Sequence, residues 1–160
     1  MPAKVHVNDK KLRDIQKEVE IFKNSFVSVG LHEGETPYPD GLTVADVGFF
    51  NEFGTENIPE RSWIRSWFDA NRRRIEKKME QLYKAVLDGK MKAKRALMLL
   101  GNWAQSEIRK TIIDLRSPPN APSTIIQKGS SNPLIDTGQM MNTVRFEVHV
   151  NSSLGKVNNL

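Results

Sequence analysis

The spacing of apolar residues in the first part of the chain predicts a helix followed by a strand. Residues 8–22 repeat apolar side chains at three- and four-residue steps, and Asn8 or Asp9 can cap the helix that this spacing predicts. The apolar face consists of Leu12, Ile15, Val19 and Phe22. Residues 25–31 alternate instead, which is typical of a strand with one mostly apolar face. That face consists of Ser25, Val27, Val29 and Leu31.

A second helix is predicted after a loop, residues 32–41, that is rich in proline and glycine. Thr43 can cap this helix, Asp46 stands at the third position of its first turn, and Gly54 is expected to end it. The apolar side consists of Val44, Val47, Phe50 and Phe53.

Two long amphipathic helices are predicted for the middle of the chain. The first runs from Ser62, its expected cap, to Leu87, and the second from Met91 to Leu115, with a break at Gly89. The first stripe is Ile64, Phe68, Ile75, Met79, Leu82 and Val86, and the second is Leu97, Leu100, Ala104, Ile108 and Ile112. A helix of about 25 residues is roughly 37 Å long, so the two must pack on each other or on a small sheet.

The last part of the chain predicts short helices and a final strand. After a proline-rich break at residues 116–124, Ser123 can cap a short helix that ends at Gly129, and Thr137 can cap a further turn. Residues 143–150 then place Val144, Phe146, Val148 and Val150 opposite Arg145, Glu147 and His149. This strand is the natural partner of residues 25–31. The expected fold class is α+β, with a small antiparallel sheet packed with two long antiparallel helices and proline-rich connecting loops.

Composition changes this picture little. A chain of 160 residues fits a single domain, with residues 1–8 and 151–160 as flexible arms. The absence of cysteine excludes disulfides, thiol catalysis and cysteine-ligated metals. No signal peptide and no apolar run of membrane-spanning length occurs, so we expect a soluble protein that is not secreted by the standard route.

The tryptophans fall on the predicted helices. Trp67 is expected in the core, close to the apolar face of the first long helix. Trp63, in the first turn after a proline loop, suits a half-exposed interface position, and Trp103 can pack against the first long helix.

Charge is segregated along the chain, whose net charge is +5. Residues 61–110 contain 14 Lys and Arg but five Asp and Glu. The candidates for a contact with DNA or an acidic partner are Arg72, Arg73, Arg74, Lys77, Lys78, Lys90, Lys92, Lys94 and Arg95. A solvated helix face explains the same residues equally well.

Catalytic signatures are weak. His6, His32 and His149 lie in an arm, a loop and a strand, without the spacing of metal ligands. The acidic residues Glu33, Glu35, Asp40 and Asp46 are better explained by loop solvation and capping than by magnesium binding. We therefore expect no enzyme activity, metal or cofactor.

Three short motifs occur in order along the chain. They are Glu52-Phe53-Gly54-Thr55, Ile58-Pro59-Glu60-Arg61-Ser62-Trp63 and Pro133-Leu134-Ile135-Asp136-Thr137-Gly138-Gln139-Met140. With the long helices between them, they resemble a family of small tailed-phage virion proteins, the neck or tail-completion proteins of the head–tail junction. These are often described as minor tail components or virion morphogenesis proteins. The resemblance covers residues 44–148, and the family usually has Phe where Trp63 stands here and Leu at Met140 or Met141.

The resemblance implies a structural role in the virion. The members of this family look like subunits of a ring, commonly with six-fold symmetry, that joins the head connector to the tail. For this chain it implies a homo-oligomer, as a hexameric ring, assembled in the host cytoplasm. Its partners would be head connector or portal-side proteins, the tail tube or tail terminator, and double-stranded DNA in the lumen, with no membrane.

Within this resemblance, residues 51–63 and 117–138 are expected to form two joints, called here the first and second joint segments. Gly and Pro would fix their backbone, and Asp136 and Thr137 would cap the last helical turn. The expected subunit or partner contacts are Phe53, Gly54, Thr55, Ile58, Pro59, Arg61, Trp63, Leu134, Ile135, Asp136, Thr137 and Gly138. Phe53, Trp63, Leu134 and Ile135 among them would fill pockets. An internal scaffolding role for the same residues stays open.

Other functions also stay open at this point. A tail terminator ring has the same class of fold and cannot be separated from a neck protein by these motifs. A basic regulator that binds double-stranded DNA would use the same cationic helices. A metal-dependent nuclease using Asp40 or Asp46 is the least favoured alternative.

Overall fold

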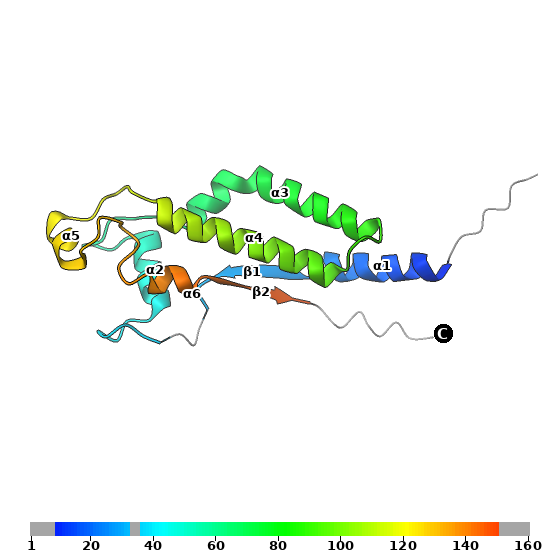
Figure 1. The fold of residues 1–160 in the computed structure, drawn as a ribbon, viewed down its shortest axis with the longest axis horizontal. Helices are drawn as coiled ribbons and strands as arrows, with labels where there is room; N and C mark the ends of the chain where they lie inside the picture. The colour runs from blue at the N-terminus through cyan, green and yellow to red at the C-terminus, as the bar shows by residue number, and fades with distance from the viewer. Residues whose placement is uncertain (1–8, 33–35, 151–160) are drawn as a thin grey trace, which may run out of the picture.

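The computed structural model describes residues 9–32 and 36–150 and has the mixed composition of an α+β fold (Figure 1). Within these residues six helices accompany one two-stranded antiparallel sheet. In chain order the elements are α1 (Asp9–Lys23), β1 (Phe26–Gly30), α2 (Val44–Phe53), α3 (Arg65–Leu87), α4 (Ala93–Asp114), α5 (Pro122–Lys128), α6 (Gln139–Thr143) and β2 (Arg145–His149). The two expected arms, with Glu33 and Glu35 of the first loop, lie outside the described residues.

The sheet joins the two segments that the sequence predicts as partners. β1 and β2 pair antiparallel, with Phe26 opposite His149 and Gly30 opposite Arg145. Val27, Val29 and Val148 pack against the apolar clusters of the core, and the ring of Phe146 lies against Gly101 of α4. The alternation that predicts each strand is therefore the alternation that buries one face of the sheet.

The long helix α4 is the element on which the others pack. It contacts α1, α3, α6 and both strands, and Figure 1 shows it beside α3. Two buried clusters lie along it. One contains the predicted residues Leu97, Leu82 and Val86, and the other contains Ala104, Ile108 and Ile112. None of the described helices is both long enough and apolar enough to cross a membrane.

The stripe predicted for α4 is confirmed, whereas those for α1, α2 and α3 are partly wrong. Phe68 and Met79 of α3 are 48% and 43% exposed. They line a groove of about 540 Å³ between α3 and β1, because the sheet packs on α4 and leaves this side of α3 uncovered. Leu12 of α1 is 47% exposed. Figure 1 shows that the N-terminal end of α1 extends past the α3–α4 pair. Phe53, at the end of α2, is 50% exposed.

Close packing of the sheet on α4 depends on Gly101. A Cβ atom at this position would lie 2.2 Å from Cδ2 of the Phe146 ring, which is far inside van der Waals contact. Phe146 is part of β2, and its backbone N–H donates a hydrogen bond to Oε1 of Gln105 in α4 at 3.1 Å. The ring therefore has little freedom to move away.

We predict that Gly101→Ala lowers the free energy of unfolding by about 1–3 kcal/mol, the usual cost of overpacking a core. Denaturant unfolding followed by circular dichroism measures this. The matched control is Asn102→Ala at the neighbouring exposed position of α4, where a change within about 0.5 kcal/mol is expected. Equal stability of the two variants would contradict the packing described here.

Candidate functional site

The first joint segment connects α2 to α3 through the buried side chain of Glu52. Its carboxylate accepts hydrogen bonds from the backbone N–H groups of Trp63, Ile64 and Arg65 at 2.7, 3.0 and 3.1 Å. The hydroxyl of Ser62 donates a fourth at 2.7 Å. The first turn of α3 carries no acidic residue of its own. Glu52 therefore supplies, from another helix, the negative charge and the acceptors that a helix N-terminus requires.

The predicted cap of α3, Ser62, contributes in part. Its hydroxyl accepts the N–H of Ser66 at 3.1 Å, but α3 begins at Arg65 rather than at Ser62. The difference arises because the carboxylate of Glu52 holds the amides of residues 63–65 before the helix starts. A local sequence pattern cannot report this tertiary cap. Its trace in the sequence is an acidic residue two positions before the helix-ending Gly54.

Gly54 ends α2 as the sequence predicts, and Thr55, expected as a contact residue, holds the loop that follows. Gly54 has φ 74°, and a Cβ there would lie 2.9 Å from the backbone N of Glu60. The hydroxyl of Thr55 accepts the N–H of Ile58 at 3.0 Å, and the N–H of Thr55 donates to the carbonyl of Ile58 at 2.8 Å. The path of this loop thus requires glycine and a short hydroxyl side chain.

Arg61 ties the first joint segment to the second. The guanidinium is buried and donates to the carbonyl oxygens of Pro118 and Pro119 at 2.8 and 3.0 Å and to Oδ1 of Asn120 at 3.2 Å. Burial lowers the pKa of Arg61. The fork of donors fits three acceptors that point inward from the proline-rich loop, which a single ammonium group could not match.

Asn120 and Asn132 complete this network, and the sequence reasoning missed both. The Asn120 amide donates to the carbonyl of Asn132 at 3.3 Å. Oδ1 of Asn132 accepts the N–H groups of Leu134 and Ile135 at 3.0 and 3.1 Å, and its amide donates to the carbonyl of Ile113 at 2.9 Å. An Asn directly before Pro133 is a signal for such a turn.

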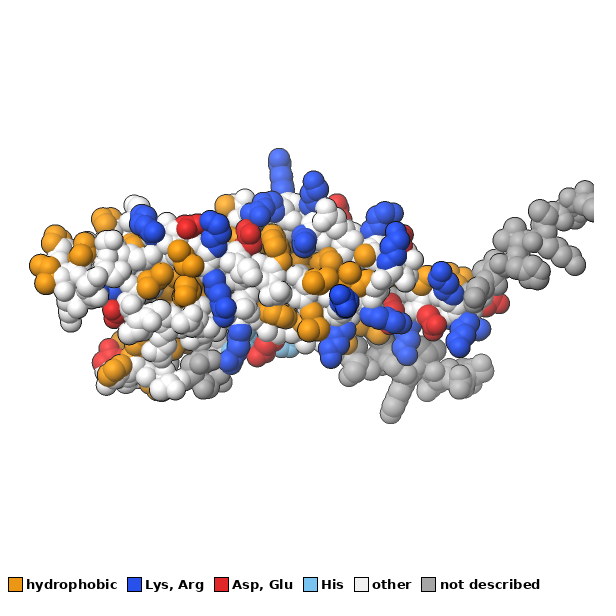
Figure 2. Space-filling model, viewed as in Figure 1, with side chains coloured by type: hydrophobic (Ala, Val, Ile, Leu, Met, Phe, Trp, Pro, Cys, Tyr) orange, Lys and Arg blue, Asp and Glu red, His pale blue; other side chains and the backbone are white. Residues whose placement is uncertain are grey.

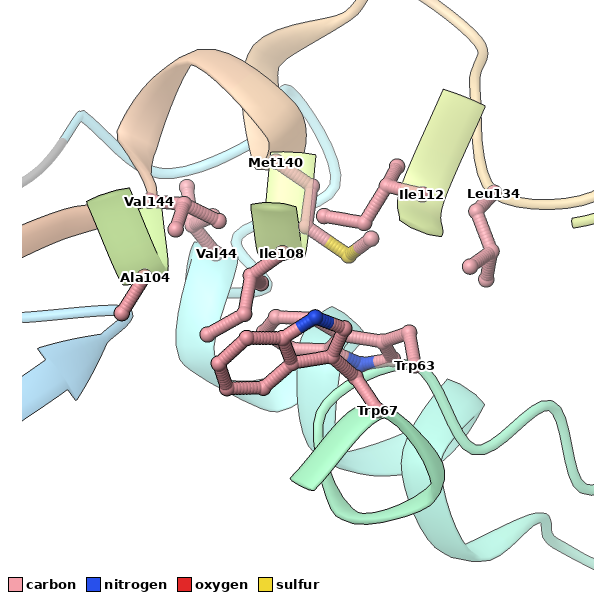
Figure 3. Packing of buried hydrophobic residues seen from close by; sticks show 9 residues of the cluster. All are labelled: Val44, Trp63, Trp67, Ala104, Ile108, Ile112, Leu134, Met140 and Val144. Atoms are coloured by element: carbon pink, nitrogen blue, oxygen red, sulfur yellow. The ribbon is translucent and has the colours of Figure 1, made fainter. Parts of the chain in front are cut away.

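Trp63 and Leu134 bring the two joint segments together in the core. They are 3% and 7% exposed and share one cluster, and Figure 3 shows Trp63 beside Trp67 there. The indole N–H of Trp63 donates to the carbonyl of Gly48 at 3.2 Å. The expectation of a half-exposed Trp63 at an interface is therefore wrong, whereas that of a buried Trp67 is confirmed. Arg61, Trp63 and Leu134 are internal scaffold.

The remaining predicted contact residues differ in exposure. Ile58, Ile135 and Gly138 are half-buried, whereas Phe53, Thr55, Pro59, Asp136 and Thr137 are exposed. Among the described residues, the Thr137 hydroxyl accepts the N–H of Gln139 at 3.3 Å, and α6 begins at Gln139, with Gly138 as its N-cap and no side-chain cap. The expectation that Asp136 and Thr137 cap this helix is therefore corrected: Gly138, with φ 81°, makes the turn. Burial lowers the pKa of the nearby Lys128, an effect that Asp136 partly offsets.

An exposed aromatic surface adjoins the first joint segment. The rings of Phe49 and Phe53 lie 4.7 Å apart, and the guanidinium of Arg65 lies 5.1 Å from the centre of the Phe53 ring. Phe68 follows Arg65 by three residues, so it lies on the same side of α3. Exposed apolar surface of this kind marks protein contacts more often than catalytic sites.

The basic residues that are visible in Figure 2 form no single cluster on the face shown. Figure 2 shows Lys and Arg side chains spread along the molecule, interrupted by hydrophobic and acidic ones. Four of the candidates have acidic partners: Arg72 with Asp69, Arg74 with Glu107, Lys90 with Asp88 and Lys92 with Glu18. In the described part of the chain no ion pair involves Arg73, Lys77, Lys78, Lys94 or Arg95. Lys94 and Arg95 border a hollow of about 630 Å³ with Met98, Leu99 and Phe146.

Asp40, Asp46 and His149 have structural partners. Asp46 forms a capping box with Thr43, and these hydrogen bonds lower the pKa of Asp46. Asp40 accepts the N–H of Leu42 at 3.1 Å, and His149 contacts the Ser28 hydroxyl at 2.9 Å. Among the described residues no group of three or more His, Asp or Glu is arranged to hold a metal ion.

No family model, no curated protein and no solved structure matches this chain. The likeness to neck and tail-completion proteins therefore rests on the three motifs and their order. What the structure adds is the connection between them, through Arg61 and through the core contacts of Trp63 and Leu134.

We predict that Glu52→Ala lowers the free energy of unfolding by about 2–3 kcal/mol, because it removes a cap and leaves buried amides without acceptors. Thermal and denaturant unfolding measure this. Glu60→Ala is the matched control, since that carboxylate is exposed and pairs only with Arg65 among described residues. Its loss should cost less than about 1 kcal/mol.

We predict that Arg61→Met, which keeps the apolar stem, lowers stability by about 2 kcal/mol, because buried acceptors in the proline-rich loop lose their donors. Hydrogen exchange should speed up at residues 113–135, whose network Arg61 supports. Arg73→Met, at an exposed position without an ion pair, is the control. Unchanged exchange in Arg61→Met would contradict the role given to Arg61.

Proposed function

We propose that this protein is a structural subunit of a tailed-phage virion that forms a ring between the head connector and the tail. The observation that carries the proposal is that hydrogen bonds and core contacts connect the three motifs into one joint. Aromatic residues are exposed on the surface of this joint. The buried part, around Glu52, Arg61 and Trp63, fixes the shape of the joint. The exposed part, Phe49 and Phe53 with Arg65, is available to a neighbouring subunit.

The charge pattern supports protein contact at one further surface. Lys94 and Arg95 border an apolar hollow that contains Met98, Leu99 and Phe146. A cationic rim around apolar side chains suits a partner with acidic and apolar residues, such as a second ring of the connector or tail. In this proposal Arg73 and Lys77 of α3, which form no ion pair with the described residues, face the DNA that passes through the lumen.

A tail terminator ring would use the same joint. A neck ring and a tail terminator ring would differ in the ring that each of them contacts.

A DNA-binding regulator is the second candidate function, favoured by the basic residues of α3 and α4 that form no ion pair with the described residues. It would bind short duplexes as an isolated protein, and log K would fall linearly with log salt concentration. A ring subunit would instead be found in purified particles.

We predict that Phe53→Asp in a phage that depends on this protein gives DNA-filled heads and separate tails, with loss of infectivity. Phe53 is exposed, so the variant should stay folded, whereas a change at buried Trp63 would act through stability. Electron microscopy and plaque counts measure the outcome. Leu12→Asp, a similar exposed position on α1, is the matched control and should assemble normally.

The same experiment can overturn the proposal. Absence of the protein from gradient-purified particles would exclude a virion role. Normal infectivity of the Phe53→Asp phage would show that the joint is not part of the subunit interface. Tight, salt-dependent binding of short duplexes by the isolated protein, together with its absence from particles, would favour the regulator.

A further inference from the structure

The outer edge of β1 borders the apolar groove. In the described residues β2 is the only strand paired with β1, so alternate N–H and C=O groups of β1 point away from β2. On that side lies the groove of about 540 Å³, with α4 as its floor and α3 as its opposite wall. Five residues that line it are Val27, Val29, Phe68, Met79 and Leu100.

The sheet sets a rule for any strand that would occupy this groove. Val27 and Val29 face the core, whereas Ser28 points to the other face, where it contacts His149. An added strand must repeat this alternation, with apolar side chains toward α4 and polar side chains outward.

The chain contains such a segment immediately before α1. Ala3, Val5 and Val7 alternate with Lys4 and His6. Paired with β1, the first three would point into the groove. Lys4 and His6 would lie on the polar face beside Ser28, near the exposed carboxylate of Glu147.

This segment cannot reach β1 of its own chain. α1 has 15 residues, which corresponds to about 22 Å, and β1 begins beyond its C-terminal end. Only Asn8 stands between Val7 and Asp9 at the start of α1, and two steps of extended chain cover about 7 Å. This limit on how far Val7 can lie from α1 does not depend on what precedes residue 3. An occupant from this segment must therefore come from another copy.

We propose that residues 3–7 of one copy pair with the outer edge of β1 in a neighbouring copy and complete a three-stranded sheet. The donor segment and the acceptor edge lie at different places on the chain, so the contact is heterologous and repeats from copy to copy around a ring. The proposal deepens the ring assembly proposed above and rests on it, because it names the segment that joins adjacent subunits.

Pairing of two β1 edges is a poorer solution. The groove is bounded by α3, so a second β1 would have to approach with its own α4 and α3 attached. A terminal segment carries no packed elements and can enter between α3 and β1. Main-chain hydrogen bonds would give the affinity, and the alternating side chains would give the register.

Disulfide trapping tests the contact directly, since the chain has no cysteine. Copies with Lys4→Cys or His6→Cys are mixed with copies carrying Ser28→Cys and oxidised. One of the two mixtures, depending on register, should give mixed disulfide dimers, identified by mass spectrometry. Ser106→Cys, at an exposed position of α4, is the control acceptor and should give only background. Dimers between two Ser28→Cys copies as the main product would favour β1–β1 pairing and overturn the proposal.

Oligomer mass provides the second test on the full chain. Val5→Asp/Val7→Asp should cause loss of the oligomer in native mass spectrometry, whereas Lys4→Gln/His6→Gln should retain it. If Val5→Asp/Val7→Asp leaves the oligomer and particle assembly intact, the strand contact is overturned and the ring stands. If the wild-type protein is monomeric and absent from particles, the ring proposal fails and this contact fails with it.

Discussion

The start of α3 depends on one buried carboxylate from another helix. Glu52 holds three backbone amides and a hydroxyl at the point where α3 begins, so the way α3 follows α2 depends on buried and partly buried hydrogen bonds to one side chain. An exposed ion pair contributes about 0–1 kcal/mol. A buried acceptor with four donors contributes more, because its loss strands the donors in the core. The position of Trp63 follows from this arrangement, since its own amide is one of the three.

Two residues of the first joint segment connect it to the rest of the fold. Trp63 packs into the cluster that contains Ile108 and Leu134, and Arg61 reaches the proline-rich loop. The motif residues therefore divide into two groups with different physical roles. Those that are buried determine the shape of the joint, and those that are exposed, above all Phe53, present apolar surface to whatever binds there.

Local patterns correctly predict the buried face of an element when other elements pack along its full length. The stripe of α4 is buried because helices and strands surround it, so periodicity alone identifies Ala104, Ile108 and Ile112. The same reasoning failed at Phe68, because periodicity shows which face of α3 is apolar but not whether another element covers it. The Glu52 cap and the Arg61 contacts join residues that are 10 to 59 positions apart, and local patterns carry no record of such pairs. The turn that Asn132 makes with Leu134 and Ile135 is local, and its signal is the Asn directly before Pro133.

The pairing of β1 with β2 also affects the order in which the elements of the chain can fold. Ser28 and His149, in contact across the sheet, stand 121 residues apart. Closing so long a loop is slow compared with forming helices and the α3–α4 hairpin, which need only local contacts. During synthesis, α1, α3 and α4 leave the ribosome before β2 does and can pack together first. Among the described residues β2 is the only strand that pairs with β1, so β1 has no partner in its own chain until β2 arrives. The residues that close the sheet are therefore among the last described residues of the chain.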